Sequence, residues 1–253
     1  MTTIITGHQP AYLPWIGLFH KIGLADIFIY MDDVQYLTRD FNNRNRIKTA
    51  NGAFWMTVPV DLKHSASRLI KDIHIDRSKA GTKFDWPRIH WETLRCHYTQ
   101  TPYFKRYADF FYDMYFNREW GLLSDLNFHQ LGFFIEALGI KVRVEKESQL
   151  GFAKKKSGRV LEHCLRFKAD LCVTGCQGRD YIDETPFKNN HIKVYYQSYQ
   201  HPAYTQNLGG FVSHLSIVDL LFNHGPDSGE IIVQGNATKK DVLKLAREVH
   251  ALG

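Results

Sequence analysis

The chain has 253 residues, of which 44% are hydrophobic and 23% are charged, the proportions of an ordinary globular protein. This composition excludes wholesale disorder, and no apolar stretch approaches the ~18 residues that a membrane-spanning helix needs. The formal charge of +6 favours an anionic partner, but the basic residues are too dispersed to indicate a DNA-binding protein. The four cysteines match no zinc-site spacing and the N-terminus carries no signal-peptide pattern, which predicts a cytoplasmic protein without zinc or disulfides.

The first thirty residues predict a β-α-β unit. Residues 4–6 form an apolar run that ends at Gly7, a helix is expected to start after Pro14 and to reach residue 24, and residues 27–30 form a second apolar run. A unit of this length is the usual opening of a Rossmann-like sheet. Further strands are expected at residues 141–145, 171–174 and 193–197, and further helices at 157–167, 183–190, 215–222 and 239–252.

The middle of the chain has a different pattern. Residues 44–49 and 54–60 flank Asn51-Gly52, a dipeptide typical of a β-hairpin turn. The spacing of apolar residues predicts three helices, at 82–98, 103–117 and 121–138. We therefore predict one α/β domain over residues 1–253, with a mostly parallel open sheet and an α-helical insertion at roughly 79–139. In such sheets, ligands bind beyond the carboxyl ends of the strands.

Polar residues follow the first predicted strand. His8 and Gln9 lie at the junction with the helix, where Tyr12 and Trp15 also fall. A His and a Gln at a strand-to-helix junction are suited to bind a phosphate, a carbonyl or an adenine edge, and a His transfers protons near neutral pH. The alternative is a structural turn fixed by two prolines. We interpret His8 as a catalytic candidate and the other three residues as substrate-binding candidates.

Two carboxylates follow the second predicted strand. Asp32 and Asp33 are suited either to hold Mg²⁺ beside a phosphate or to serve as a base with an electrostatic partner. Gln35 is a substrate-binding candidate in the same segment. The alternative is a solvated strand end without a function, and the sequence favours neither interpretation over the other.

A basic segment precedes the Asn-Gly turn. If it is a strand, Arg44, Arg46 and Lys48 lie on one face at a period of two, and Asn43 lies on the other. Three cations on one face repel each other unless an anion compensates. A phosphate-bearing ligand is favoured here, because Arg binds phosphate with two parallel hydrogen bonds. The alternative is an exposed basic edge strand that prevents aggregation.

A glycine-rich segment follows the strand at 171–174. It lacks the Gly-Lys-Ser/Thr ending of a phosphate-binding P-loop, but its glycines permit close approach of a ligand. Cys176 is a candidate nucleophile, although a small packing residue is the more common role of such a cysteine. The substrate-binding candidates in this segment are Gly175, Gln177, Gly178, Arg179, Asp180 and Tyr181.

At these clusters the chain resembles the WbqC-like protein family. The matching stretches are HQPAYLPWIGLFHKIGLADIFIYMDDVQY (8–36), FNNRNRIK (41–48), GCQGRDYI (175–182), HPAYTQ (201–206) and LSIVDLLFNHGP (215–226), which span nearly the whole chain. The resemblance implies a bacterial cytoplasmic protein tied to O-antigen or other surface-polysaccharide genes, and some members are described as glycine or aminoacyl transferases acting on amino sugars. It brings no set of catalytic residues, so the site assignments come from the clusters themselves.

We therefore expect an enzyme that transfers an aminoacyl group, such as glycyl, or an acyl group to the amine of a nucleotide-linked amino sugar. His8 is the candidate base, oriented by one of the two aspartates, and Gln9, Gln177 and backbone amides of residues 175–178 are candidate donors to the carbonyl oxyanion. The expected acyl donor is a carrier-protein thioester, an aminoacyl-tRNA or an amino acid activated by ATP. Two alternatives remain open, namely a non-catalytic module that binds a sugar nucleotide or a carrier protein, and a Mg²⁺-dependent nucleotidylyl transferase.

Overall fold

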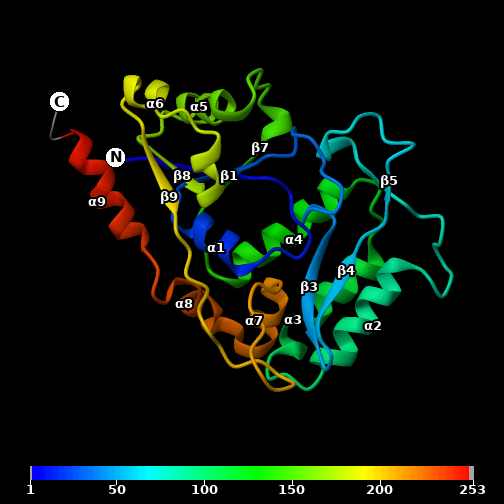
Figure 1. The fold of residues 1–253 in the computed structure, drawn as a ribbon. Coiled ribbons are helices and arrows are strands. Elements are labelled where there is room, and N and C mark those ends of the chain that lie inside the picture. The colour runs from blue at the N-terminus through cyan, green and yellow to red at the C-terminus, as the bar shows by residue number, and fades with distance from the viewer. Residues whose placement is uncertain (1, 251–253) are drawn as a thin grey trace.

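The computed structural model describes residues 2–250. Five parallel strands form one open sheet in the order β7-β2-β1-β8-β9 (Figure 1). The strands are β1 (Ile4–His8), β2 (Ile27–Tyr30), β7 (Arg143–Lys146), β8 (Leu171–Gly175) and β9 (Lys193–Gln197). The predicted α/β fold with a mostly parallel open sheet is therefore confirmed, and its opening β-α-β unit contains α1 (Ile16–Gly23).

Helices cover both faces of the sheet, which explains why its central strands are apolar runs without alternation. On one face, Ile5, Ile29 and Cys172 pack with apolar residues of α5 (Lys156–Arg166) and α6 (Thr185–Asn189). On the other face, Ile4 and Val173 pack with residues at the end of α1 and in α9 (Lys239–His250). Figure 1 shows α5 and α6 on the side of the sheet opposite to α1.

The direction of the connections reverses between β1 and β8. The chain leaves β1 through α1 and enters β2 on one side, whereas it leaves β8 through α6 and enters β9 on the other side. Pairing between β1 and β8 ends at Thr6 and Val173, although β1 continues to His8 and β8 to Gly175. The last two residues of each strand therefore pair only with the outer neighbours, β2 and β9, and the two strands separate at what we call the β1/β8 switch point. Ligands of open α/β sheets bind outside the carboxyl ends of strands at such a point.

The long segment between β2 and β7 contains two hairpins and the predicted helices. The hairpins are β3 (Arg44–Thr49) with β4 (Gly52–Thr57), and β5 (Val60–Asp61) with β6 (His74–Ile75). The helices are α2 (Trp86–Tyr98), α3 (Phe104–Tyr112) and α4 (Leu123–Ala137), with a π-helical turn η2 (Asp113–Asn117) after α3 and a 3₁₀ turn η1 (Ile70–Asp72) before β6. Their apolar residues form a common core with residues of α1 and β2. The sequence patterns missed β5 and β6, which contain two residues each and are too short to show a periodicity.

The turn of the β3–β4 hairpin lies one residue earlier than predicted. Thr49 pairs with Gly52, so Ala50 and Asn51 form the loop. Gly52 has a φ of +94°, a conformation that residues with a side chain rarely adopt. The dipeptide Asn51-Gly52 therefore indicated the correct hairpin but not the correct loop residues.

After β7 the chain adds short turns and the last helices. These are η3 (Glu147–Gln149), η4 (Cys176–Asp180), α7 (Ile217–His224), η5 (Gly225–Asp227) and α8 (Ser228–Val233). Across residues 2–250, no helix combines the length and the apolar character needed to cross a membrane.

Candidate functional site

His8 ends strand β1 and presents a neutral imidazole at the β1/β8 switch point. Its Nδ1 lies 2.7 Å from the carbonyl oxygen of Gln9. Because a carbonyl oxygen only accepts, Nδ1 carries the proton and Nε2 keeps its lone pair. No hydrogen bond from another described residue reaches Nε2. Burial and, to a smaller extent, the nearby charge of Lys21 together lower the pKa of His8 to about 3. His8 is therefore uncharged at neutral pH with Nε2 open to accept a hydrogen bond, but it is a much weaker base than the near-neutral histidine expected from the sequence.

Lys21 reaches the same strand end from helix α1. Helical side chains lean toward the N-terminus of their helix, and in α1 that end faces the carboxyl edge of the sheet. The Nζ atom donates a hydrogen bond to the carbonyl oxygen of Gly7 at 3.0 Å, and the residue is only 5% exposed. Burial lowers the pKa of Lys21 to about 8, against an opposing effect of the Cys172 and Cys176 thiols. Lys21 was not among the residues predicted for the site, although a lysine between Phe19 and Ile22 on an apolar helix is itself a signal of a buried charge.

The glycine-rich segment after β8 forms the short turn η4 on the other side of the switch point. Its Cys176 is exposed. Gly178 is buried against Thr174, where an added Cβ would lie 2.5 Å from Oγ1, so only glycine permits this tight turn. The Arg179 guanidinium lies 4.5 Å from the ring centroid of Tyr196. The other candidates of this segment are at least partly exposed: Gly175, Gln177, Asp180 and Tyr181.

Both aspartates after β2 are engaged by protein groups. The Asp32 carboxylate is buried and accepts hydrogen bonds from the Ser148 backbone N–H at 2.9 Å and from its hydroxyl at 2.7 Å. Asp33 forms an ion pair with Lys71 at 2.7 Å. Neither carboxylate is hydrogen-bonded to His8, and Gln35 is exposed. No group of three or more His, Cys, Asp or Glu side chains within residues 2–250 is arranged to hold a metal ion.

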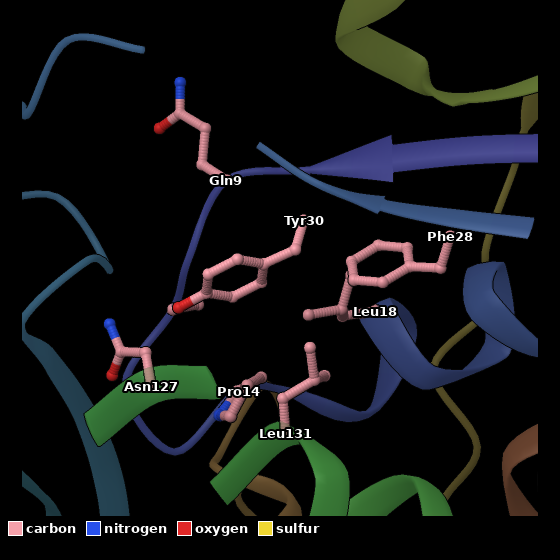
Figure 2. Close-up of a pocket in the computed structure, with 8 residues that line it drawn as sticks. Gln9, Pro14, Leu18, Phe28, Tyr30, Asn127 and Leu131 are labelled. Carbon is pink, nitrogen blue, oxygen red and sulfur yellow. The ribbon is translucent and has the colours of Figure 1, made fainter. Parts of the chain in front are cut away.

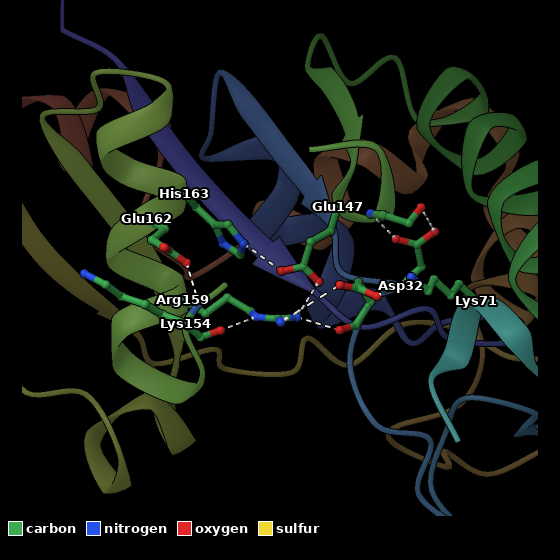
Figure 3. Close-up of polar contacts among 9 residues, drawn as sticks. Asp32, Lys71, Glu147, Lys154, Arg159, Glu162 and His163 are labelled. Carbon is green, nitrogen blue, oxygen red and sulfur yellow. Dashed lines mark hydrogen bonds and ion pairs between the residues drawn. The ribbon is translucent and has the colours of Figure 1, made fainter. Parts of the chain in front are cut away.

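A buried ionic cluster connects α5 to the carboxyl ends of β2 and β7 (Figure 3). Glu147 is fully buried, with one oxygen 2.8 Å from Nε2 of His163 and the other 3.4 Å from Arg159. Arg159 also donates to the backbone carbonyl of Asp33. No sequence pattern singled out these residues, because they match no motif and because Asp33 lies 126 residues before Arg159. Their contacts position Asp33 and support the sheet edge.

Side-chain amides hold the loop between β1 and α1. Asn42 donates to the carbonyl oxygen of Pro10 at 2.8 Å, and Asn45 donates to that of Leu13 at 2.7 Å. Gln130 accepts from the backbone N–H of Leu13 at 3.0 Å. The neighbouring amide of Asn43 donates to the carbonyl oxygen of Val58 at 2.8 Å. These amides satisfy the buried backbone, as polar groups without access to water require.

Tyr12 and Trp15 have different environments in that loop. The Tyr12 hydroxyl is buried between His90, at 2.7 Å, and the Tyr115 hydroxyl, at 2.6 Å, and burial raises its pKa. Trp15 is partly exposed and stacks on His214 with ring centroids 5.6 Å apart. Tyr12 therefore lies in the core, whereas Trp15 lies at a surface.

A small cavity lies beneath the loop (Figure 2). Its volume is about 10 Å³, the room of a single water molecule. It is lined by Gln9, Ala11, Pro14, Leu18, Phe28, Tyr30, Asn127 and Leu131. In Figure 2 the Gln9 side chain points away from the apolar lining. This cavity is too small for a sugar or a nucleotide.

The outer face of the β3–β4 hairpin carries two arginines over one tryptophan. Arg44 and Arg46 lie 4.3 Å and 5.5 Å from the ring of Trp55. Their hydrogen bonds go to backbone carbonyls, and no described carboxylate pairs with either guanidinium. Lys48 is instead buried, and its Nζ donates to the carbonyl oxygens of Gly209 and Gly210. The basic face predicted from the sequence therefore leaves two arginines partly exposed over Trp55, a residue that no sequence pattern singled out.

Comparisons with known proteins agree with the resemblance. The profile of the WbqC-like protein family matches residues 9–231. The uncharacterized protein Rv1507c of Mycobacterium tuberculosis is 36% identical over 225 residues, which are 88% of this chain and 95% of that protein. No solved structure matches the chain.

Proposed function

The chain belongs to the WbqC-like protein family, and we propose that it is a transferase of bacterial surface-polysaccharide biosynthesis. The proposed reaction moves an acyl or aminoacyl group to the amine of a nucleotide-linked amino sugar. One observation carries this proposal: the neutral His8 imidazole, whose Nδ1 is fixed by Gln9, offers a free Nε2 at the carboxyl edge of the sheet. Amide formation needs an acceptor for the proton of the attacking amine, and efficient transfer requires that substrate binding raise the pKa of His8 from about 3 toward the working pH.

The reaction balances with His8 as the proton carrier. The neutral amine of the sugar attacks the carbonyl carbon of the acyl donor, and a C–N bond forms. Nε2 of His8 takes the proton that the nitrogen loses. The bond from the carbonyl carbon to the donor sulfur or oxygen then breaks, and the proton passes to that leaving group. The Nδ1–H hydrogen bond to Gln9 holds the ring in the tautomer that this transfer needs.

The hairpin face is suited to the nucleotide part of the acceptor. Arg44 and Arg46 have no carboxylate partner, so their guanidinium groups are available to phosphate oxygens. Trp55 lies beneath both guanidinium groups, also contacts Phe41, and is 39% exposed, so its free edge is available for contact with the nucleotide. Asn45 of β3 donates to the carbonyl oxygen of Leu13, in the loop that follows His8, so the hairpin contacts the loop that leaves the proposed site.

The turn η4 is suited to the acyl donor. Its exposed Cys176 and the backbone of residues 175–178 lie across the switch point from His8. Three classes of acyl donor are considered. A carrier-protein thioester and an aminoacyl-tRNA are both attached to acidic macromolecules and so suit a basic protein. The third class is an amino acid activated by ATP. The Mg²⁺-dependent alternative is less favoured, because Asp32 and Asp33 are occupied by Ser148 and Lys71.

The test compares His8→Ala with His64→Ala, a matched change at a histidine whose side chain is 71% exposed. Each protein is assayed with a panel of nucleoside-diphosphate amino sugars and acyl donors, and nucleotide-sugar affinity is measured by calorimetry. We expect His8→Ala to lower kcat by about 10²- to 10⁴-fold with unchanged affinity, and His64→Ala to behave as the wild type. Loss of affinity with turnover intact, or no turnover by the wild type, would favour the binding module. Pyrophosphate release from a nucleoside triphosphate would favour nucleotidylyl transfer.

A further inference from the structure

The carboxyl end of β1 holds a buried positive charge that no acidic group balances. Lys21 is 5% exposed, and no Asp or Glu among residues 2–250 lies within ion-pair distance of its Nζ. We infer that Lys21 forms an anion-binding site at the β1/β8 switch point, and that its ligand is a phosphate group.

The unused donors of Lys21 support this inference. An ammonium group has three N–H donors and accepts nothing. One of them is used by the Gly7 carbonyl at 3.0 Å, and no other hydrogen bond of Nζ to a described residue is found. Removing a cation from water is costly unless it is paired. A protein retains such a group most readily where a ligand supplies the missing negative charge.

The position of Lys21 in the fold supports it independently. Gly7 lies in β1 immediately after Thr6, the last residue that pairs with β8. The Lys21 amine is therefore hydrogen-bonded to the residue at which β1 and β8 stop pairing with each other. This is where open α/β sheets bind their ligands, and those ligands are commonly phosphate compounds.

The neighbours of Lys21 favour an anion over a cation. The ionisable groups near it are the His8 imidazole and the thiols of Cys172 and Cys176. His8 is neutral, and the positive charge of Lys21 is one cause of its low pKa. A bound phosphate would offset that charge, and it offers several acceptor oxygens to the free donors of Lys21. The inference does not depend on acyl transfer, because it concerns the charge and donors of the unliganded protein.

The test uses inorganic phosphate and pyrophosphate as probes and isothermal calorimetry as the readout. All proteins carry Arg44→Ala and Arg46→Ala, so that phosphate binding at the hairpin face is removed. Lys21→Met is compared in this background with Lys188→Met, which makes the same charge change at a side chain that is 73% exposed. We expect Lys21→Met to weaken phosphate binding by about 10- to 100-fold, the loss of one charge-assisted interaction, and Lys188→Met to leave it unchanged. Equal binding by the two variants, or no phosphate binding in the background protein, would overturn the inference.

A second measurement on the wild-type chain covers the case in which Lys21→Met does not fold. Lysines are acetylated with acetic anhydride in the presence and absence of phosphate, and the modified peptides are quantified by mass spectrometry. Phosphate is expected to slow acetylation of Lys21 at least several-fold and to leave Lys188 unaffected. The same rate at Lys21 with and without phosphate contradicts the site.

Discussion

Burial sets the protonation of the two residues at the end of β1. His8 and Lys21 have no acidic partner among the described residues, and the pKa of each is lowered mainly by loss of water. For His8 the result is a neutral ring at any physiological pH. For Lys21 the pKa of about 8 leaves the amine mostly charged at pH 7 but able to lose its proton in mildly basic solution. A charged Lys21 and a neutral His8 suit a site that binds an anion beside a proton acceptor.

The lowered pKa of Lys21 predicts how stability depends on pH. The pKa falls from 10.5 in the unfolded chain to about 8 in the folded one, so between these values the unfolded chain binds more protons. Stability therefore rises with pH in this window, whereas below pH 8 the penalty is constant. We expect the free energy of unfolding of the wild type to gain about 3 kcal/mol relative to Lys21→Met between pH 8 and 10.5. Urea unfolding of both proteins in phosphate-free buffer measures it, and a pH-independent difference would contradict a buried, unpaired amine.

At the scale of elements, contacts from distant segments hold the carboxyl edge of the sheet. The loop after β1 is fixed by amides from β3 and α4, and the loop after β2 is fixed by Ser148 and by Arg159 of α5. Glu147 is the centre of the second set, since its buried carboxylate meets both Arg159 and His163. Removing one member of a buried charge cluster leaves another charge without a partner, which costs more than the loss of an exposed ion pair.

The ionic cluster gives a prediction at this scale. Arg159→Met removes the permanently charged partner of the fully buried Glu147 and leaves only His163, which is charged only when protonated, so we expect the free energy of unfolding to fall by about 3–5 kcal/mol. The matched control is Arg95→Met in α2, whose ion pair with Glu92 has side chains 58% and 49% exposed; it should cost less than about 1 kcal/mol. Urea denaturation compares the two. Similar small losses would mean that Arg159 is dispensable at this edge.

In the whole molecule, the proposed chemistry and the proposed nucleotide site lie on different substructures. His8 belongs to the parallel sheet, whereas Arg46 belongs to a hairpin in the segment inserted between β2 and β7. The two are joined through the loop after β1, which Asn42 and Asn45 contact. In the proposed reaction, the hairpin would bind the nucleotide part of the substrate, and the end of the sheet would carry out the acyl transfer.

This arrangement predicts a separation of kinetic effects. Arg46→Ala removes a phosphate contact that exists in both the ground state and the transition state, so it should raise KM for the nucleotide sugar about 10- to 100-fold with a smaller effect on kcat. Arg166→Ala, at an exposed position of α5, is the control for the lost charge. Steady-state kinetics over a range of nucleotide-sugar concentrations distinguishes the outcomes. If Arg46→Ala and the control have the same KM, the phosphates bind elsewhere, and Arg179 becomes the next candidate.

The sequence by itself determined the secondary structure of the sheet and the positions of the polar clusters. The apolar runs at 27–30 and 193–197 reproduced β2 and β9, whereas β1 continues two residues beyond the predicted run at 4–6, through Gly7 to His8. These elements are predictable because a strand buried on both faces must be apolar and must end where polar groups begin. The same reasoning placed His8 and Cys176 at strand ends, and family resemblance covered nearly the whole chain.

Only the tertiary structure decided what those polar residues contact. Asp32, Lys48 and Tyr12 are chemically suited to a site, yet their partners are Ser148, backbone carbonyls and a buried histidine. Those partners are distant in the chain, so the spacing of residues in the sequence cannot predict them. Conversely, Lys21 is one residue within an apolar helix, and its significance depends on the strand order that puts β8 beside β1. A local sequence pattern predicts which side chains of one helix or strand are buried and where that element ends. The charge balance of a site depends instead on the contacts from every element that packs around it.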